Sequence, residues 1–211
     1  MSPATDPRAH DGRASPGTGP SSAPLTLPET ATLVAGHVAV EEALFELTGA
    51  WSVDPGTPAV ASFFASQSAF HAWRAAEWSA RLPRSVQSGS TAPPEAWGAA
   101  LEAVRATTGD AAPDGLDDDD LPLARLATWT VALQPGLLAR YRRHRGVLAA
   151  AADGGLDRWL GLALADAGEG WSAGNELLHR ITAEGSAGAA QGGVAVDRGA
   201  RVLSILLGGS G

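Results

Sequence analysis

Apolar side chains recur at helical spacing in every long segment of this chain that can bury a core. When residues 30–48 are wound at about 100° per residue, the bulky apolar side chains fall on one broad arc. Segments 58–82, 121–151 and 156–183 show the same period, and a shorter amphipathic stretch covers 93–109. No segment alternates apolar and polar residues as a half-buried strand does. The sequence therefore predicts an all-α protein.

Breaks in this pattern predict where the long helices bend. Pro135 lies inside the third long segment and predicts a kink, because proline lacks a backbone N–H and its ring crowds the preceding turn. Gly168, Gly170 and Gly174 lie inside the fourth and predict an interrupted or weakened helix. A long connection separates the second and third main helices, which is typical of a bundle with a crossover.

Composition divides the chain into four parts. Residues 1–28 are rich in Pro, Gly, Ser and Ala and nearly lack large apolar groups, so we expect a disordered N-terminal tail. Residues 29–184 form the predicted helical-bundle domain. Residues 185–193 are a predicted flexible linker, and 194–211 a short C-terminal element.

Charge and residue usage exclude several classes of function. The net charge of −8 argues against a nucleic-acid binder, which needs a basic surface. The absence of cysteine excludes disulfides and thiolate chemistry, so any metal site would use His, Asp and Glu. No apolar run approaches the roughly 18–20 residues that span a bilayer. We expect a cytoplasmic protein without a membrane partner, for which a homo-oligomer stays open.

The first long helix carries two polar residues where its core-facing surface should be. His37 and Glu41 lie near the middle of the apolar arc, whereas Glu42 and Glu46 lie on the far side. Glutamate is almost never buried without a partner, so Glu41 predicts a polar site inside the bundle. For His37 an alternative stays open, namely a core-edge histidine bonded to a backbone carbonyl.

The second long helix offers partners for Glu41. In "HAWRAAEWSARLP", residues 71–83, His71, Arg74 and Glu77 step by three residues and can reach one neighbourhood. A buried carboxylate needs a cation, and a guanidinium pairs well with carboxylates. We therefore expect a buried polar cluster of His37, Glu41, His71, Arg74 and Glu77.

The third and fourth helices contribute weaker signals. Tyr141 and His144 share the apolar face of the third helix. Glu176 and His179 have Glu-x-x-His spacing, which sets a carboxylate and an imidazole side by side. They lie largely opposite the apolar arc of their helix, so they turn inward only if the glycines reset the helical phase.

These motifs together resemble a ferritin-like four-helix bundle, and the "HAWRAAEWSARLP" stretch is similar to that of uncharacterised actinobacterial-type proteins. Ferritin-like proteins bind two iron or manganese ions through a Glu from each of two helices and Glu-x-x-His from the other two. The resemblance implies Glu41, His71, Glu77, Glu176 and His179 as candidate metal ligands. The chain departs from the pattern, since the second helix lacks Glu-x-x-His and the third contains no Glu.

Two classes of function follow. The first is a non-catalytic helical bundle that acts through partner or small-ligand binding, with the Glu/Arg/His cluster in place of a full di-metal centre. The alternative is a ferritin-like iron- or manganese-binding oxidoreductase. We favour the first, because the carboxylate ligands are too few for two ions. Whether the chain is an enzyme stays open.

Overall fold

The computed structural model describes residues 25–53, 57–82, 93–108, 121–148 and 153–184, and all regular structure in these ranges is helical. This confirms the predicted all-α class. The elements are α1 (Leu27–Ser52), α2 (Pro58–Ser79), α3 (Glu95–Thr108), α4 (Leu121–Thr128), the π-helical turn η2 (Trp129–Leu133), α5 (Gln134–Gly146) and α6 (Gly154–Glu184).

The first helix begins inside the segment that we expected to be a tail. Thr26 caps α1: its hydroxyl accepts from the Glu29 backbone N–H at 3.4 Å, and the Glu29 carboxylate accepts from the Thr26 N–H at 2.7 Å. This reciprocal capping box satisfies two backbone donors and fixes the start of the helix. The rest of the predicted tail (1–24), the predicted linker and the predicted C-terminal element lie outside the described residues.

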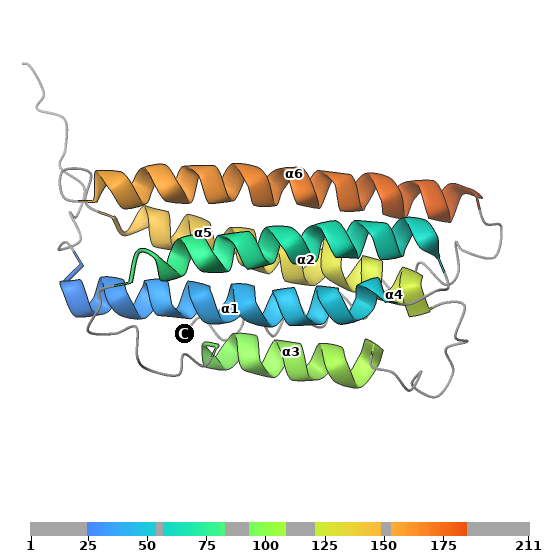
Figure 1. The fold of residues 1–211 in the computed structure, drawn as a ribbon, viewed down its shortest axis with the longest axis horizontal. Coiled ribbons are helices and arrows are strands. Elements are labelled where there is room, and N and C mark those ends of the chain that lie inside the picture. The colour runs from blue at the N-terminus through green and yellow to red at the C-terminus, as the bar shows by residue number, and fades with distance from the viewer. Residues whose placement is uncertain (1–24, 54–56, 83–92, 109–120, 149–152, 185–211) are drawn as a thin grey trace, which may run out of the picture.

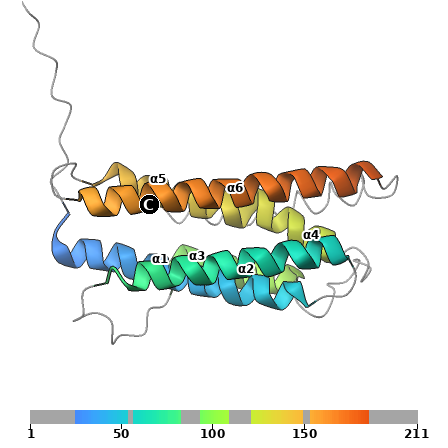
Figure 2. The same cartoon turned by 45° about the horizontal axis from the view of Figure 1, so that its top comes forward.

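The long helices form two antiparallel pairs (Figures 1 and 2). One pair is α1 with α2, which share the most extensive interface, and the other is α6 with the continuous helix α4–η2–α5. The chain direction of α1 matches that of α6, because the long connection after α2 returns the chain to the opposite end and includes α3 (Figure 1). Within the described part of the chain, no helix is long and apolar enough to cross a membrane.

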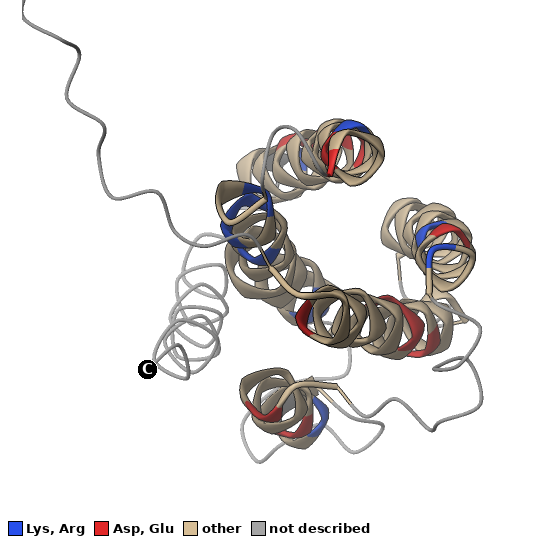
Figure 3. Cartoon of the chain, turned by 90° about the vertical axis from the view of Figure 1, so that its left-hand side faces the viewer, with Lys and Arg blue, Asp and Glu red and all other residues tan. Residues whose placement is uncertain are grey.

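The core lies between the helices, which surround it in the end-on view of Figure 3. Large side chains from each long helix are fully buried there, among them Leu44, Phe64, Trp78, Trp129 and Leu160. His71, Arg74 and Trp78 of α2 face this core, whereas Phe70 and Trp73 are each 45% exposed. By contrast, α2 contacts α6 at few positions.

A π-helical turn, η2, lies directly before Pro135, where we predicted a kink. In a π-helix the N–H of one residue bonds the carbonyl five residues earlier, so Pro135 leaves the Thr130 carbonyl without a backbone donor. The indole N–H of Trp171 on α6 donates to this carbonyl at 2.8 Å. Next to it, the Gln134 amide donates to the Ala167 carbonyl at 2.7 Å. Side chains that cross between the two helices therefore stabilise the irregular turn.

The glycines of α6 do not interrupt it, contrary to our expectation, and the helix is continuous from Gly154 to Glu184. Gly170 and Gly174 allow close packing, whereas Gly168 faces open space. A Cβ atom at Gly174 would lie 2.7 Å from Trp129 Cζ3 and 2.9 Å from Thr130 Cγ2. These small residues let α6 approach its neighbours where larger side chains would clash.

Two glycine-to-alanine substitutions should have opposite effects on stability. Gly174→Ala should lower the free energy of unfolding by about 1–3 kcal/mol, because the new methyl group overpacks against Trp129. Gly168→Ala should raise it by about 0.5–1 kcal/mol, because the site is open and alanine favours the helix. Urea denaturation of both variants measures the difference, and equal effects would contradict this account of α6.

Candidate functional site

Glu41 is fully buried in the middle of α1, and three side chains donate to its carboxylate. His71 Nδ1 on α2 lies 2.6 Å from Glu41 Oε2, and Arg74 Nε donates to Oε1 at 2.8 Å. The hydroxyl of Tyr141 on α5 donates to the same Oε1. A buried glutamate needs hydrogen-bonding partners, and here two neighbouring helices, α2 and α5, supply them.

Arg74 connects this carboxylate to a third helix. Its side chain is 1% exposed, and its Nη1 bonds the carboxylate of Asp166 on α6. Burial raises the pKa of Glu41, but the charge of Arg74 and the hydrogen bonds from His71 and Arg74 together lower it by more, so the net pKa lies below its ordinary value. Burial lowers the pKa of Arg74, but the charges of Glu41 and Asp166 and the hydrogen bond to Glu41 are among the causes that together raise it by more, so the net pKa lies above its ordinary value. Both groups are thus ionised, and one cation lies between two carboxylates.

The tautomer of His71 follows from its two neighbours. Nδ1 lies 2.6 Å from Glu41 Oε2 and 2.8 Å from Arg74 Nη2, and it cannot donate to one and accept from the other in the same state. An ionised carboxylate only accepts, so the proton belongs on Nδ1. Burial lowers the pKa of His71 by more than the charge of Glu41 raises it, so the ring is neutral at pH 7. Its Nε2 is then a bare acceptor, buried without a hydrogen-bond partner among the described residues.

His37 belongs to a second network beside the first. Arg140 Nε donates to His37 Nδ1 at 3.1 Å, so His37 carries its proton on Nε2 and donates it to His144 Nδ1 at 2.8 Å. His37 therefore bonds another imidazole in place of the backbone carbonyl that the sequence left open. Burial, and then the charge of Arg140, hold the pKa of His37 well below its ordinary value and that of His144 at about 4.

Trp78 and Tyr141 join the two networks. The Trp78 indole donates to the Tyr141 hydroxyl at 2.9 Å, and its ring stacks on His37 with centroids 4.5 Å apart. Tyr141 also meets the His37 ring edge-on at 5.0 Å. His37 thus contacts the cluster through aromatic rings and makes no hydrogen bond to Glu41.

Glu77 lies outside the cluster in which we expected it. Its side chain is 39% exposed and pairs with Arg81 at 2.8 Å on the surface of α2. Each step of three residues turns a helix by about 300°, so two steps carry position 77 about 120° away from His71. Position 78, seven residues after His71, is the one that returns to the buried face, and Trp78 occupies it.

Glu176 and His179 also remain outside the cluster. Both are exposed on α6. Because α6 passes its glycines without a break, the helical phase is not reset and both side chains stay off the buried face of α6. These two candidate metal ligands, like Glu77, do not come together with Glu41 and His71.

Sequence reasoning missed Asp166 and Arg140 and did not assign Tyr141 to the cluster. A signal for Asp166 was present, because it lies three residues after Ala163 and seven after Trp159, both of which are buried. The apolar arc that we inferred for this helix was centred on its leucines, so we did not recognise the spacing of Asp166 from these two residues. Tyr141 lay on the predicted core face, but nothing in the sequence indicated its contact with Glu41.

The donors around Glu41 do not fit the di-metal centre that the ferritin-like resemblance implies. Both oxygens of Glu41 accept hydrogen bonds, and Asp166 is paired with Arg74. A guanidinium has no lone pair for a metal. Across the described ranges, no three His, Asp or Glu side chains gather as a metal site needs.

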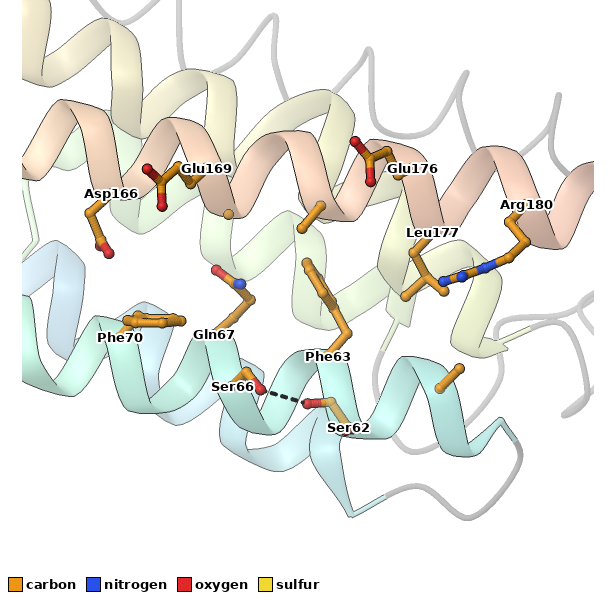
Figure 4. Close-up of a pocket in the computed structure, with 13 residues that line it drawn as sticks. Ser62, Phe63, Ser66, Gln67, Phe70, Asp166, Glu169, Glu176, Leu177 and Arg180 are labelled. Carbon is orange, nitrogen blue, oxygen red and sulfur yellow. Dashed lines mark hydrogen bonds between the residues drawn. The ribbon is translucent and has the colours of Figure 1, made fainter.

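A pocket of about 540 Å³ lies next to the cluster, between α2 and α6 (Figure 4). Asp166, which holds Arg74, forms one end of its lining, so the pocket and the cluster share a residue. Phe63, Gln67 and Phe70 reach into it from α2, and Glu169 and Glu176 line it from α6. Its volume is that of ordinary small-molecule sites.

Comparisons with protein-family models, with curated proteins and with solved structures find no match for this chain.

Proposed function

We propose that the chain is a non-catalytic, ferritin-like helical bundle that binds a small ligand and carries a permanent ionic cluster where that fold holds two metal ions. The observation that carries the proposal is the Arg74 guanidinium between Glu41 and Asp166. The order of the helices, with one long connection after α2, supports the ferritin-like part. A cytoplasmic location and any homo-oligomer stay predictions from the sequence.

The chemistry of the cluster supports a structural role for it. Arg74 supplies the positive charge that metal ions would supply, and the donors of Arg74, Tyr141 and His71 together leave no carboxylate oxygen of Glu41 free. The cluster links α1, α2, α5 and α6 through hydrogen bonds at the centre of the bundle. Such a network fixes how the helices are arranged, because each buried charge is satisfied in one arrangement only.

Metal analysis of the purified protein tests the proposal. After expression in medium that contains iron and manganese, mass spectrometry should find less than one equivalent of either metal per chain. Glu41→Gln, with its fold checked by circular dichroism, should leave that content unchanged, and His179→Gln serves as an exposed control. Stoichiometric metal that is lost in Glu41→Gln and kept in His179→Gln would overturn the proposal.

One observation favours the alternative, an iron- or manganese-binding oxidoreductase. His71 Nε2 is buried and has no partner in the described part of the chain. Its lone pair could therefore bind a metal ion. A metal there would still need carboxylate oxygens that Arg74 now occupies. Metal retained in the parent protein and lost in His71→Gln would identify this alternative.

A further inference from the structure

We propose that the pocket between α2 and α6 binds an organic cation: a small molecule with a protonated amine and an apolar, preferably aromatic, body. The inference rests on the proposed function and names the ligand class of its binding site. Three independent features of the pocket carry it: an apolar wall, carboxylates that make no ion pair with the described residues, and an amide that lines the pocket.

The apolar wall favours a ligand with a hydrophobic body. Phe63, Phe70 and Leu177 line the pocket, and Phe70 is 45% exposed although it is a large aromatic residue. Figure 4 shows the Phe63 and Phe70 side chains on the α2 side of the pocket, facing α6. A ligand ring laid against them would remove apolar surface from water, and a cation over an aromatic face is attracted by it.

The charges of the pocket favour a cation. Glu169 and Glu176 line it and form no ion pair with any residue that the structure describes. Asp166 is paired with Arg74, and Arg180 lies at the opposite end of the pocket (Figure 4). Glu169 and Glu176 outnumber Arg180, so the lining keeps a net negative charge beside the apolar wall. An anionic ligand would be repelled there.

Gln67 offers a hydrogen-bonding group to a ligand, independently of the charges. Its side chain is 4% exposed, and its amide has no hydrogen-bond partner among the described residues. It points from α2 toward α6 within the pocket (Figure 4), and a Cβ atom at Gly170 would lie 2.7 Å from its Oε1. The amide lines the pocket, and its oxygen can accept a hydrogen bond from an ammonium group. A purely apolar ligand would make no such bond.

A matched set of probes separates charge from shape. 2-Phenylethylammonium, 2-phenylethanol and phenylacetate share an aromatic ring on a short chain and differ in charge. Each is titrated into the full chain at low salt, and binding is followed by ¹H–¹⁵N chemical shifts. The cation should bind about tenfold more tightly than the alcohol, equivalent to about 1.4 kcal/mol. Phenylacetate should bind more weakly than either, and added salt should reduce the cation's advantage.

Paired variants locate the effect. Glu169→Gln with Glu176→Gln should bring the affinity for the cation down to that for the alcohol. The control is Glu42→Gln with Glu46→Gln, which makes the same change of charge on exposed positions of α1 and should keep the preference. Gln67→Leu should weaken binding of the cation more than binding of the alcohol, because a charged ammonium group donates a stronger hydrogen bond to the amide oxygen than a neutral hydroxyl does.

Equal affinity for the cation and the alcohol, no binding of the cation, or a preference that survives in the Glu169/Glu176 variant would each overturn the inference. Failure of the bundle proposal gives a different result, namely stoichiometric metal bound through Glu41. A cation preference in a metal-containing protein would therefore support the ligand class and reject the non-catalytic bundle. A metal-free protein without that preference would reject the ligand class alone.

Discussion

Replacing Arg74 with leucine should lower the free energy of unfolding by about 3–5 kcal/mol, the usual cost of removing one partner from a buried ion pair. Arg74 is 1% exposed and bonds both Glu41 and Asp166. Its loss leaves the fully buried Glu41 carboxylate without its counter-ion, whereas Asp166 is 23% exposed and can turn to water. Urea denaturation at pH 7 measures the change.

Arg105→Leu is the matched control. Arg105 pairs with Glu102 at 2.7 Å on the surface of α3, and its side chain is 45% exposed. Exposed pairs of this kind contribute about 0–1 kcal/mol, so this variant should stay close to the parent protein. If Arg74→Leu were as mild as Arg105→Leu, the cluster could not be what holds Glu41 in the core.

A double variant separates the buried charge from the lost side-chain volume. Arg74→Leu with Glu41→Leu removes both members of the pair, so no carboxylate is left buried without a cation. It should be more stable than Arg74→Leu alone, because replacing a whole buried pair with apolar groups is often neutral or stabilising. A double variant that is less stable than the single one would show that packing, and not charge, sets the cost.

Acidification should destabilise the protein steeply, because three buried histidines are held neutral in the folded state. The pKa values of His37, His71 and His144 are all lowered, mainly by burial, and that of His144 lies at about 4. Unfolding restores ordinary values near 6.5, so the unfolded chain binds more protons below that pH. Stability is therefore fully present above pH 6.5 and is lost as the pH falls toward the folded pKa values.

The expected slope is about 1.4 kcal/mol per pH unit for each histidine that takes up a proton on unfolding. For His144 the window runs from about pH 6.5 to about pH 4. Glu41 adds to the loss only at lower pH, because its folded pKa lies below its ordinary value. Free energies of unfolding measured in urea between pH 7 and pH 4 give the slope directly.

Two histidine variants test the assignment. His144→Gln removes about one of the protons taken up on unfolding. The slope should therefore fall by about 1.4 kcal/mol per pH unit. His179→Gln changes an exposed histidine on α6 and should leave the slope as it is. A stability that is flat from pH 7 to pH 4.5, or the same slope in both variants, would exclude buried neutral histidines as the cause.

The sequence alone determined the helical class and which side chains of each helix turn inward. Helical spacing depends only on positions within one helix, so the inward placement of His37, Glu41, His71 and Arg74 could be predicted from it. The same rule, applied with the correct period, excludes Glu77 and would have included Asp166. These errors came from where the apolar arc was centred, not from a lack of information.

Only the tertiary structure decided which inward side chains meet. Glu41 bonds Tyr141 from 100 residues away, and His37 pairs with His144 instead of joining Arg74. Such contacts depend on how far each helix is shifted along its axis and rotated against its neighbours. Those displacements are set by the packing of small and large residues, such as Gly174 against Trp129, and no local pattern records them.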